Sequence, residues 1–182
     1  LEPIFKETSR LENLVNDLLL YGRPPVPALR TTRWHEILNP LQAHARQIIG
    51  KRDIRFEAQA HAVEWETDPD LLQGALLNLL RNAAEAIGDR PGGEIRLEIR
   101  TEGKGLTLAV VDNGSGLPEG AGPRLFEPFF TTKTSGTGLG LAITRRLVRS
   151  LGGELSILPG VLRGVQALVQ FPTVMVRPIE DA

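Results

Sequence analysis

Three polar side chains share one stripe of a helix-forming segment and could ligate a cation. Asn78, Asn82 and Glu85 occur in the run Asn-Leu-Leu-Arg-Asn-Ala-Ala-Glu-Ala that spans 78–86. At 100° per residue they fall within a stripe about 60° wide, beside the apolar face of the predicted helix. Their oxygen atoms are hard ligands of the kind that Mg²⁺ takes from proteins. The alternative interpretation is a solvated helix edge.

A carboxylate is expected at the end of a buried strand. Apolar residues alternate over 106–110, and Asp112 has the same parity, so it should emerge on the apolar side. A carboxylate there needs a donor, and an exocyclic amine of adenine would serve. Gly114 and Gly116 would let the backbone turn tightly and approach a flat ligand. A plain Asx turn is the alternative.

Two further segments point to a ligand that carries phosphates. The run Leu-Phe-Glu-Pro-Phe-Phe-Thr-Thr-Lys over 125–133 places aromatic residues in a long loop, 113–137, which suggests a lid whose Lys133 reaches phosphate. An ordinary surface loop with anchoring aromatics is the alternative. The run Gly-Thr-Gly-Leu-Gly-Leu over 136–141 opens a helix, where free backbone N–H groups can bind phosphate. It is neither a dinucleotide fingerprint nor a P-loop.

The segments that must position these residues form a mixed pattern of helices and strands. The capping signal Thr-Asp-Pro-Asp at 67–70 begins a helix that runs to about residue 87. The sequence predicts an α+β fold with helices on one face of a mixed sheet. The other elements expected are a helix over 4–21, a proline-rich break over 22–27, a helix over 34–49, strands over 54–56 and 63–65, a hairpin of 94–100 with 106–111, a helix over 139–151, and strands over 154–158 and 165–171.

Composition narrows the function further. The chain of 182 residues has no cysteine, which excludes disulfides and thiol catalysis, and its net charge of −1 argues against nucleic-acid binding. It contains no apolar run long enough to span a membrane and no secretory signal. A cytoplasmic location is therefore expected.

Taken together and in this order, the four segments resemble the N, G1, F and G2 boxes of histidine kinases, which are members of the GHKL superfamily of ATP-binding domains. The resemblance covers about 30–172, and the F and N segments are most similar to the NtrB-like subgroup. It implies a two-layer α/β sandwich of the Bergerat type that binds ATP and Mg²⁺ and transfers the γ-phosphate to a histidine.

The resemblance also implies a role for each motif residue. Asn82 is the principal Mg²⁺ ligand with Asn78 in support, and Asn82 and Lys133 form the catalytic pair. Glu85 replaces the basic residue of other subgroups, so phosphate neutralisation falls more on Lys133. The set expected to bind nucleotide comprises Asn78, Asn82, Glu85, Asp112, Gly114, Gly116, Phe130, Thr131, Thr132, Lys133, Thr137, Gly138, Leu139 and Gly140.

The resemblance predicts the organisation and the partners as well. Residues 1–22 resemble the end of a dimerisation-bundle helix, with a linker over 23–30, the ATP-binding domain over 31–172 and a tail over 173–182 without a pattern. The acceptor histidine is expected outside this chain, on a bundle helix of the same protein or of a partner protomer. A response regulator and a homodimer of the full-length protein are the other expected partners.

One segment imitates the acceptor motif. His-Glu-Ile-Leu-Asn-Pro-Leu at 35–41 is similar to the H box, but here a helix and a linker precede it instead of following it. Only about 43 residues separate His35 from Asn78, too few for a second bundle helix, so His35 is not expected to be the acceptor.

Two other functions remain open. ATPases of the same superfamily carry a glutamate one turn before the Mg²⁺-binding asparagine to activate water, whereas this chain has Asn78 there, and an amide is no base. A non-catalytic, nucleotide-sensing dimerisation module is the third possibility.

Overall fold

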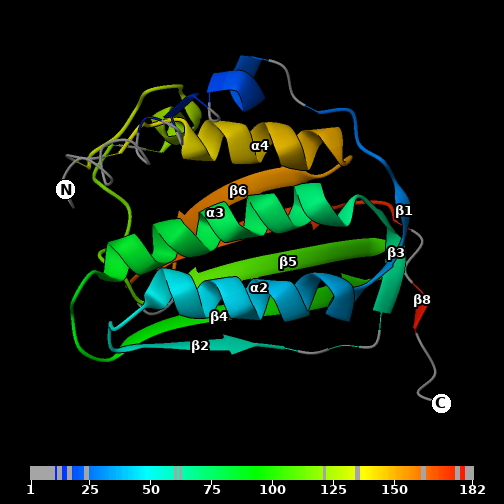
Figure 1. The fold of residues 1–182 in the computed structure, drawn as a ribbon, viewed down its shortest axis with the longest axis horizontal. Coiled ribbons are helices and arrows are strands. Elements are labelled where there is room, and N and C mark those ends of the chain that lie inside the picture. The colour runs from blue at the N-terminus through cyan, green and yellow to red at the C-terminus, as the bar shows by residue number, and fades with distance from the viewer. Residues whose placement is uncertain are drawn as a thin grey trace.

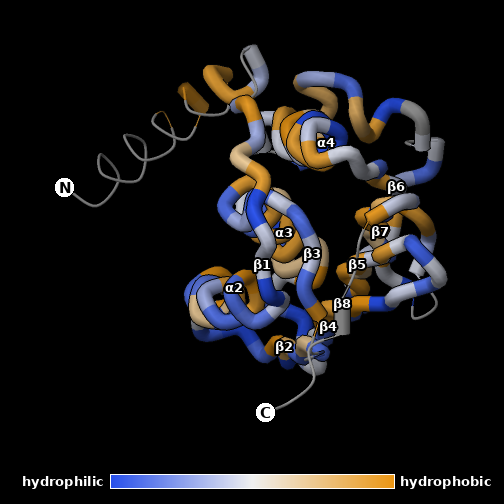
Figure 2. Tube along the Cα trace, turned by 90° about the vertical axis from the view of Figure 1, so that its right-hand side faces the viewer, coloured by the Kyte–Doolittle hydropathy of each residue, from blue (hydrophilic) through white to orange (hydrophobic). Residues whose placement is uncertain are grey.

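The computed structural model describes residues 11, 14–15, 18–22, 25–59, 61, 63–120, 122–133, 136–160, 163–174 and 177–178. Three helices lie on one face of a five-stranded sheet, as Figure 1 shows. Figure 2 turns the molecule so that the helical layer and the sheet are seen edge-on. The predicted two-layer α+β fold is confirmed.

The five-stranded sheet is mixed, as expected. Its order is β2-β4-β5-β7-β6, and only β2 with β4 is a parallel pair. The strands are β2 (Ile54–Ala58), β4 (Gly93–Glu102), β5 (Gly105–Asp112), β6 (Glu154–Pro159) and β7 (Val165–Phe171). The predicted hairpin is β4 with β5, in a register that pairs Ile95 with Asp112.

The helices are α2 (Trp34–Ile49), α3 (Pro69–Ile87) and α4 (Gly140–Ser150). A short 3₁₀ turn, η1 (Pro123–Phe126), lies within the long loop. Between the layers the core is apolar, with the buried leucines of α3 facing those of β4 and β5. Its members include Leu72, Leu76, Leu80, Leu97 and Leu108, all without measurable or with negligible exposure.

The outer side of β4 carries a different pattern. Buried residues alternate with half-buried charged ones, and neighbours on the outer face form ion pairs. Arg96 contacts Glu94 at 2.7 Å, and Arg100 contacts Glu98 at 2.5 Å. Alternation of this kind is typical of a sheet with one packed and one solvated face.

A second, small sheet differs from the expectation. β1 (Arg30–Arg33), β3 (Val63–Thr67) and β8 (Arg177–Pro178) pair in the order β1-β3-β8. The sequence analysis placed Arg30 in a linker and left residues after 172 without a pattern. Strands of two to four residues are too short to show periodicity, so only their tertiary pairing reveals them.

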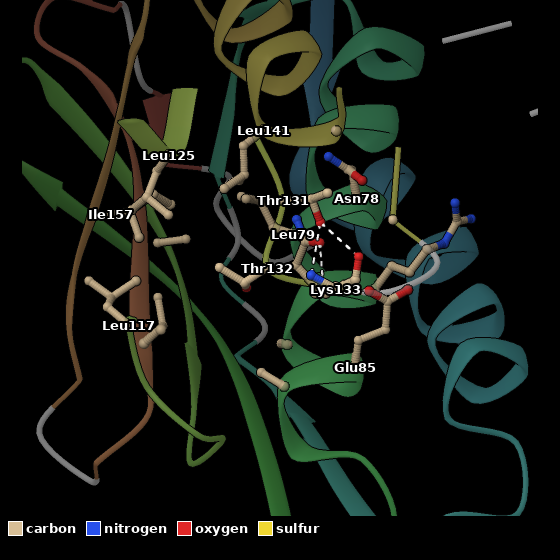
Figure 3. A pocket seen from close by; sticks show the side chains of 18 of the residues that line it. Asn78, Leu79, Glu85, Leu117, Leu125, Thr131, Thr132, Lys133, Leu141 and Ile157 are labelled. Carbon is tan, nitrogen blue, oxygen red and sulfur yellow. Dashed lines mark hydrogen bonds and ion pairs between the residues drawn. The ribbon is translucent and has the colours of Figure 1, made fainter. Parts of the chain in front are cut away.

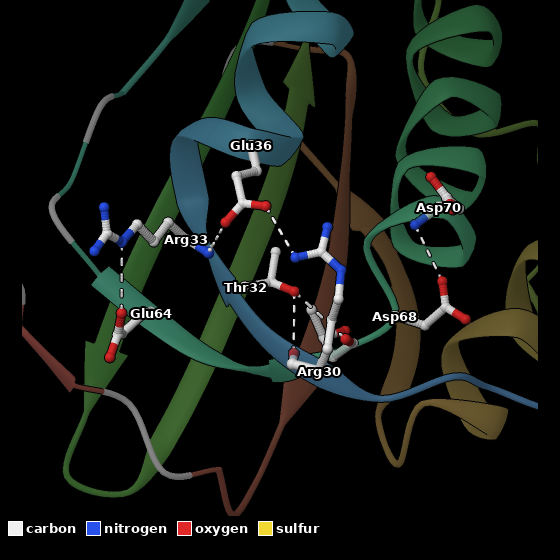
Figure 4. A network of polar contacts seen from close by, with 8 residues as sticks. Arg30, Thr32, Arg33, Glu36, Glu64, Asp68 and Asp70 are labelled. Carbon is white, nitrogen blue, oxygen red and sulfur yellow. Dashed lines mark hydrogen bonds and ion pairs between the residues drawn. The ribbon is translucent and has the colours of Figure 1, made fainter.

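The segment that imitates the acceptor motif has a structural role. The Arg33 backbone N–H donates to Glu36 Oε1 at 2.9 Å, and Arg30 Nη1 donates to Oε2 at 2.9 Å, which fixes the start of α2 (Figure 4). His35 is exposed and α2 packs on α3. His35 is thus part of a helix of the sheet domain.

The described residues between 11 and 22 are helical and lie beside α4. Arg146 of α4 donates to the carbonyl oxygen of Tyr21, and its guanidinium lies 4.9 Å from the centre of the Tyr21 ring. The expectation for Ile4 lies outside the described residues. No helix in the described part of the chain is long and apolar enough to cross a membrane.

Candidate functional site: a cavity between two helices, the sheet and a lid

The polar stripe on α3 faces a cavity. Asp68 starts this helix, because its Oδ1 accepts from the backbone N–H groups of Asp70 and Leu71, both at 3.1 Å (Figure 4). The apolar face of the helix is buried in the core. Asn78, Asn82 and Glu85 consequently lie at the edge of that face, and all three line a cavity of about 940 Å³.

The cavity has an apolar wall opposite this stripe. The sheet, the loop after β5 and the start of α4 form it, and Figure 3 shows Leu117, Leu125, Leu141 and Ile157 on that side. A flat, uncharged group fits against such a wall, whereas the polar α3 side suits a charged one. The apolar lining residues, none of which the motif analysis named, are Leu79, Val110, Leu117, Pro118, Leu125, Leu141, Ile157, Val165 and Ala167.

Asp112 is the buried carboxylate of the cavity, with 5% of its surface exposed. Its Oδ1 accepts from the backbone N–H groups of Gly114 at 2.7 Å and Val165 at 3.3 Å. Within the described part of the chain Oδ2 has no partner and is available to a ligand. Burial raises the pKa of Asp112, while the two backbone N–H groups and the charge of Arg90 act in the opposite direction.

Glycines permit this close arrangement. A Cβ on Gly114 would come within 2.8 Å of Ala86 Cβ, and the next amide, of Ser115, donates to the Ala86 carbonyl at 3.1 Å. Gly116 has φ +80, and a Cβ there would lie 2.8 Å from the Arg163 carbonyl oxygen. Gly164, which the sequence analysis did not single out, would overlap Asp112 if it carried a side chain.

Lys133 closes the polar end of the cavity. Its ammonium donates to Asn82 Oδ1 at 3.2 Å and to Glu85 Oε2 at 2.5 Å, as Figure 3 shows. A positive charge therefore already lies between two oxygens of α3. The Asn82 Nδ2 atom is buried and lacks a partner among the described residues, so this amide is only half satisfied.

The lid is held at its base by arginine–aromatic contacts. The Arg145 guanidinium of α4 lies 4.6 Å from the Phe126 ring centre, and Arg124 lies 4.5 Å from that of Phe130. Gly138, with φ +68, packs on the backbone of Phe129, whose N–H donates to the Gly138 carbonyl at 3.0 Å. Phe129 itself is 63% exposed, unlike its two aromatic neighbours.

The structure brings the predicted residues together with two exceptions. Gly114 supports the turn beneath Asp112 instead of lining the cavity. Leu139 has its side chain fully buried in the core, and its N–H donates to Thr137 Oγ1 at 3.3 Å. Arg81 lines the cavity but was missed, because an exposed arginine on a helix has no distinctive sequence signal. The predicted residues that line the cavity are Asn78, Asn82, Glu85, Asp112, Gly116, Phe130, Thr131, Thr132, Lys133, Thr137, Gly138 and Gly140.

Residues 67–175, which contain every one of these side chains, match the sequence family described as histidine kinase-, DNA gyrase B- and HSP90-like ATPases. The chain belongs to this family. As a member of this ATPase family it has the GHKL fold, and its site is the family's ATP-binding cavity.

Curated relatives of this family member are sensor histidine kinases. The chain is 36% identical over 154 residues to the sensor histidine kinase ZraS of Escherichia coli (strain K12), which covers 84% of the chain. It is 32% identical over 162 residues to the nitrogen regulation protein NtrY of Azorhizobium caulinodans, which covers 86% of it. The chain spans only 33% of the length of ZraS and 21% of that of NtrY.

Solved structures agree with this ATPase-family assignment. The mycobacterial sensor histidine kinase MprB superposes with a TM-score of 0.69 at 27% identity, covering 82% of this chain and 100% of that one. Histidine kinase ThkA, in complex with response regulator protein TrrA, gives a TM-score of 0.77 at 27% identity. That superposition covers 93% of this chain and 49% of the other.

Proposed function

We propose that this chain is the ATP-binding catalytic part of a sensor histidine kinase, which transfers the γ-phosphate of ATP to a histidine outside it. The observation that carries the proposal is the polarity of the single cavity. A buried carboxylate with a free oxygen, Asp112, lies among apolar walls at one end, and amides with a lysine lie at the other. Adenine and a triphosphate have the same division.

Asp112 selects the base in this proposal. Its free Oδ2 accepts from an exocyclic amine, while Oδ1 stays with its two backbone donors. A charged acceptor in a buried site makes a strong hydrogen bond and rejects a ligand that offers no donor. The apolar wall holds the ring in the plane that this bond requires.

Lys133 and the helix that begins at Gly140 neutralise the phosphates. The ammonium lies at the polar end of the cavity, and the first N–H groups of α4 have no partner within the helix. Transfer to a histidine needs mostly positioning and charge stabilisation from the protein, which these groups provide. Asn78 supports transfer over hydrolysis, because its amide cannot remove a proton from water.

The cation site fits Mg²⁺ as a shared ligand. Asn82 Oδ1 and Asn78 supply amide oxygens, and the ammonium of Lys133 already stabilises a positive charge beside Asn82. No group of three or more His, Cys, Asp or Glu residues in the described ranges could hold a metal ion by itself. A bound Mg²⁺ would therefore be shared with phosphates and water, and would supply charge neutralisation between the β- and γ-phosphates.

The partners follow from the same proposal. We place residues 1–22 at the end of a dimerisation-bundle helix, 23–30 in a linker and 31–172 in the ATP-binding domain, with 173–182 as a tail. The acceptor histidine lies on a bundle helix of the same protein or of a partner protomer. A response regulator receives the phosphate, as the complex of ThkA with TrrA suggests.

Nucleotide binding and phosphate release test the proposal together. The chain should bind Mg-ATP and release almost no phosphate by itself, yet label a bundle domain that bears an acceptor histidine. The label should be acid-labile and base-stable, as a phosphohistidine is. Sustained release of phosphate without transfer would overturn the proposal, move the chain to the ATPase function, and make Glu85 the first base to test.

A further inference from the structure

Thr144 is a buried residue of α4 that does not reach the cavity, yet it contacts a residue that does. Its hydroxyl is fully buried and lies one turn after Gly140. Asn78 Nδ2 donates to Thr144 Oγ1 at 2.6 Å, across the interface between α3 and α4. Thr144 Oγ1 in turn donates to the Gly140 carbonyl oxygen at 2.8 Å.

The direction of these hydrogen bonds is fixed by their chemistry. A backbone carbonyl only accepts, so the single proton of the Thr144 hydroxyl is used on Gly140. Thr144 Oγ1 can then only accept from Asn78, which must present its NH₂ group to α4. The other end of the amide, Oδ1, is left for the cavity, as Figure 3 shows with the nitrogen towards α4 and the oxygen away from it.

The packing around Asn78 makes this choice of rotamer firm. A Cβ on Gly140 would lie 3.0 Å from both Asn78 Oδ1 and Nδ2, so the amide rests directly on the start of α4. Among the described residues no donor contacts Asn78 Oδ1. An amide held in this way offers an acceptor to a cation or its water, whereas the flipped amide would offer two N–H donors and repel it.

We propose that Thr144 is a positioning residue of the Mg-nucleotide site, whose hydroxyl orients the Asn78 amide so that its oxygen faces the ligand. The inference rests on the proposed function, because it concerns how the same cavity selects a cation with its nucleotide. It adds a residue that neither touches the ligand nor belongs to the motif runs of the sequence.

Thr144→Val tests the proposal, because valine has nearly the same shape and no hydroxyl. We expect Mg-ATP binding to weaken about fivefold, as for loss of one oriented hydrogen bond, with adenosine binding unchanged. Thr144→Ser keeps the hydroxyl and should restore the wild-type affinity. In an Asn78→Ala background Thr144→Val should have no further effect, since the residue it orients is gone.

Other outcomes separate the two proposals. A wild-type chain that fails to bind Mg-ATP overturns the proposed function. Wild-type binding with Thr144→Val equal to it, or with adenosine weakened as much as Mg-ATP, overturns only the role of Thr144. Should Thr144→Val fail to fold, the side-chain amide resonances of Asn78 decide: they should match in the wild type and Thr144→Ser, and a loss of the hydrogen bond in the serine variant contradicts the proposal.

Discussion

Asp112 combines a ligand contact with an electrostatic penalty. Burial raises its pKa, so the folded domain binds a proton at this group more readily than the unfolded chain does. The ionised form therefore destabilises the fold at pH values above the folded-state pKa. That penalty disappears as the pH falls through this pKa, while the acceptor for an amine disappears with it.

Asp112→Asn should separate these two effects. Its Oδ1 keeps the N–H groups of Gly114 and Val165, but its NH₂ opposes an adenine amine. We expect ATP affinity to fall about 10- to 100-fold, the worth of a charge-assisted hydrogen bond. Thermal unfolding without nucleotide should shift upward by about 2–4 °C. A lower melting temperature with unchanged affinity would contradict both parts.

Lys133 and Glu85 should act in opposite directions on nucleotide binding. Lys133→Met removes the charge that meets the phosphates, so ATP affinity should fall about tenfold while adenosine affinity stays constant. Glu85→Gln removes a carboxylate that holds Lys133 and repels phosphate, so ATP affinity should rise about two- to fivefold. Lys104→Met, on the turn between β4 and β5, makes the same charge change far from the cavity and should alter neither. Equal effects of both lysine variants would contradict a specific role for Lys133.

At the scale of elements, the lid depends on one glycine contact. A Cβ on Gly138 would lie 2.7 Å from the Phe129 Cα, against backbone that cannot rotate away. Gly138→Ala should therefore displace the lid and weaken ATP binding at least about tenfold, measured by titration, with the circular dichroism of the domain preserved. Because φ there is positive, the substitution also carries a backbone penalty of roughly 1–2 kcal/mol.

Gly120→Ala is the matched control for that backbone penalty. Gly120 has φ +73 in the same long loop, with no atom within 4 Å of an added Cβ. It should lower stability by the same order without changing the affinity for ATP. If the two variants weaken binding equally, loop strain and not the contact with Phe129 explains the effect.

The elements with long periodic patterns were predictable from sequence, and the short ones were not. The helix α3 and the hairpin of β4 with β5 have strong caps and clean alternation, so their faces and the position of Asp112 followed directly. β1 and β8 are defined by pairing with β3, which is a property of the tertiary structure. For the same reason the motifs located the polar and glycine residues of the cavity but missed its apolar wall and Thr144.

The whole molecule divides the core unevenly along the chain. The buried core residues lie between Trp34 and Phe171, whereas of the described residues before 23 only Leu14 and Tyr21 pack against that core. The helix that ends at Gly22 instead exposes much of its apolar surface, with Leu11 at 55% and Leu19 at 66%. A surface of that kind indicates a further partner for this helix, which agrees with the proposed bundle.

Deletion of residues 1–24 should therefore leave the domain folded. A chain of 25–182 keeps the hydrogen bond of Ala28 to Asp68 at 2.9 Å and the whole sheet. We expect a cooperative melting transition within about 5 °C of the intact chain and an ATP affinity changed by less than about fivefold, since only an exposed cation–π contact and a few apolar contacts are lost. Loss of cooperative unfolding would show that the upstream helix belongs to the domain core.

The two adjacent arginines of α4 give that small change in affinity a second meaning. Arg145 lies on the lid aromatic Phe126, and Arg146 lies on Tyr21 at the end of the upstream helix. One rigid helix of 11 residues thus joins the wall of the cavity to the segment that leads out of the domain. By thermodynamic linkage, the factor by which the upstream helix alters ATP affinity equals the factor by which ATP alters the docking of that helix. A nucleotide that fills the cavity would then report its presence to the rest of the protein without any group of the ligand leaving the site.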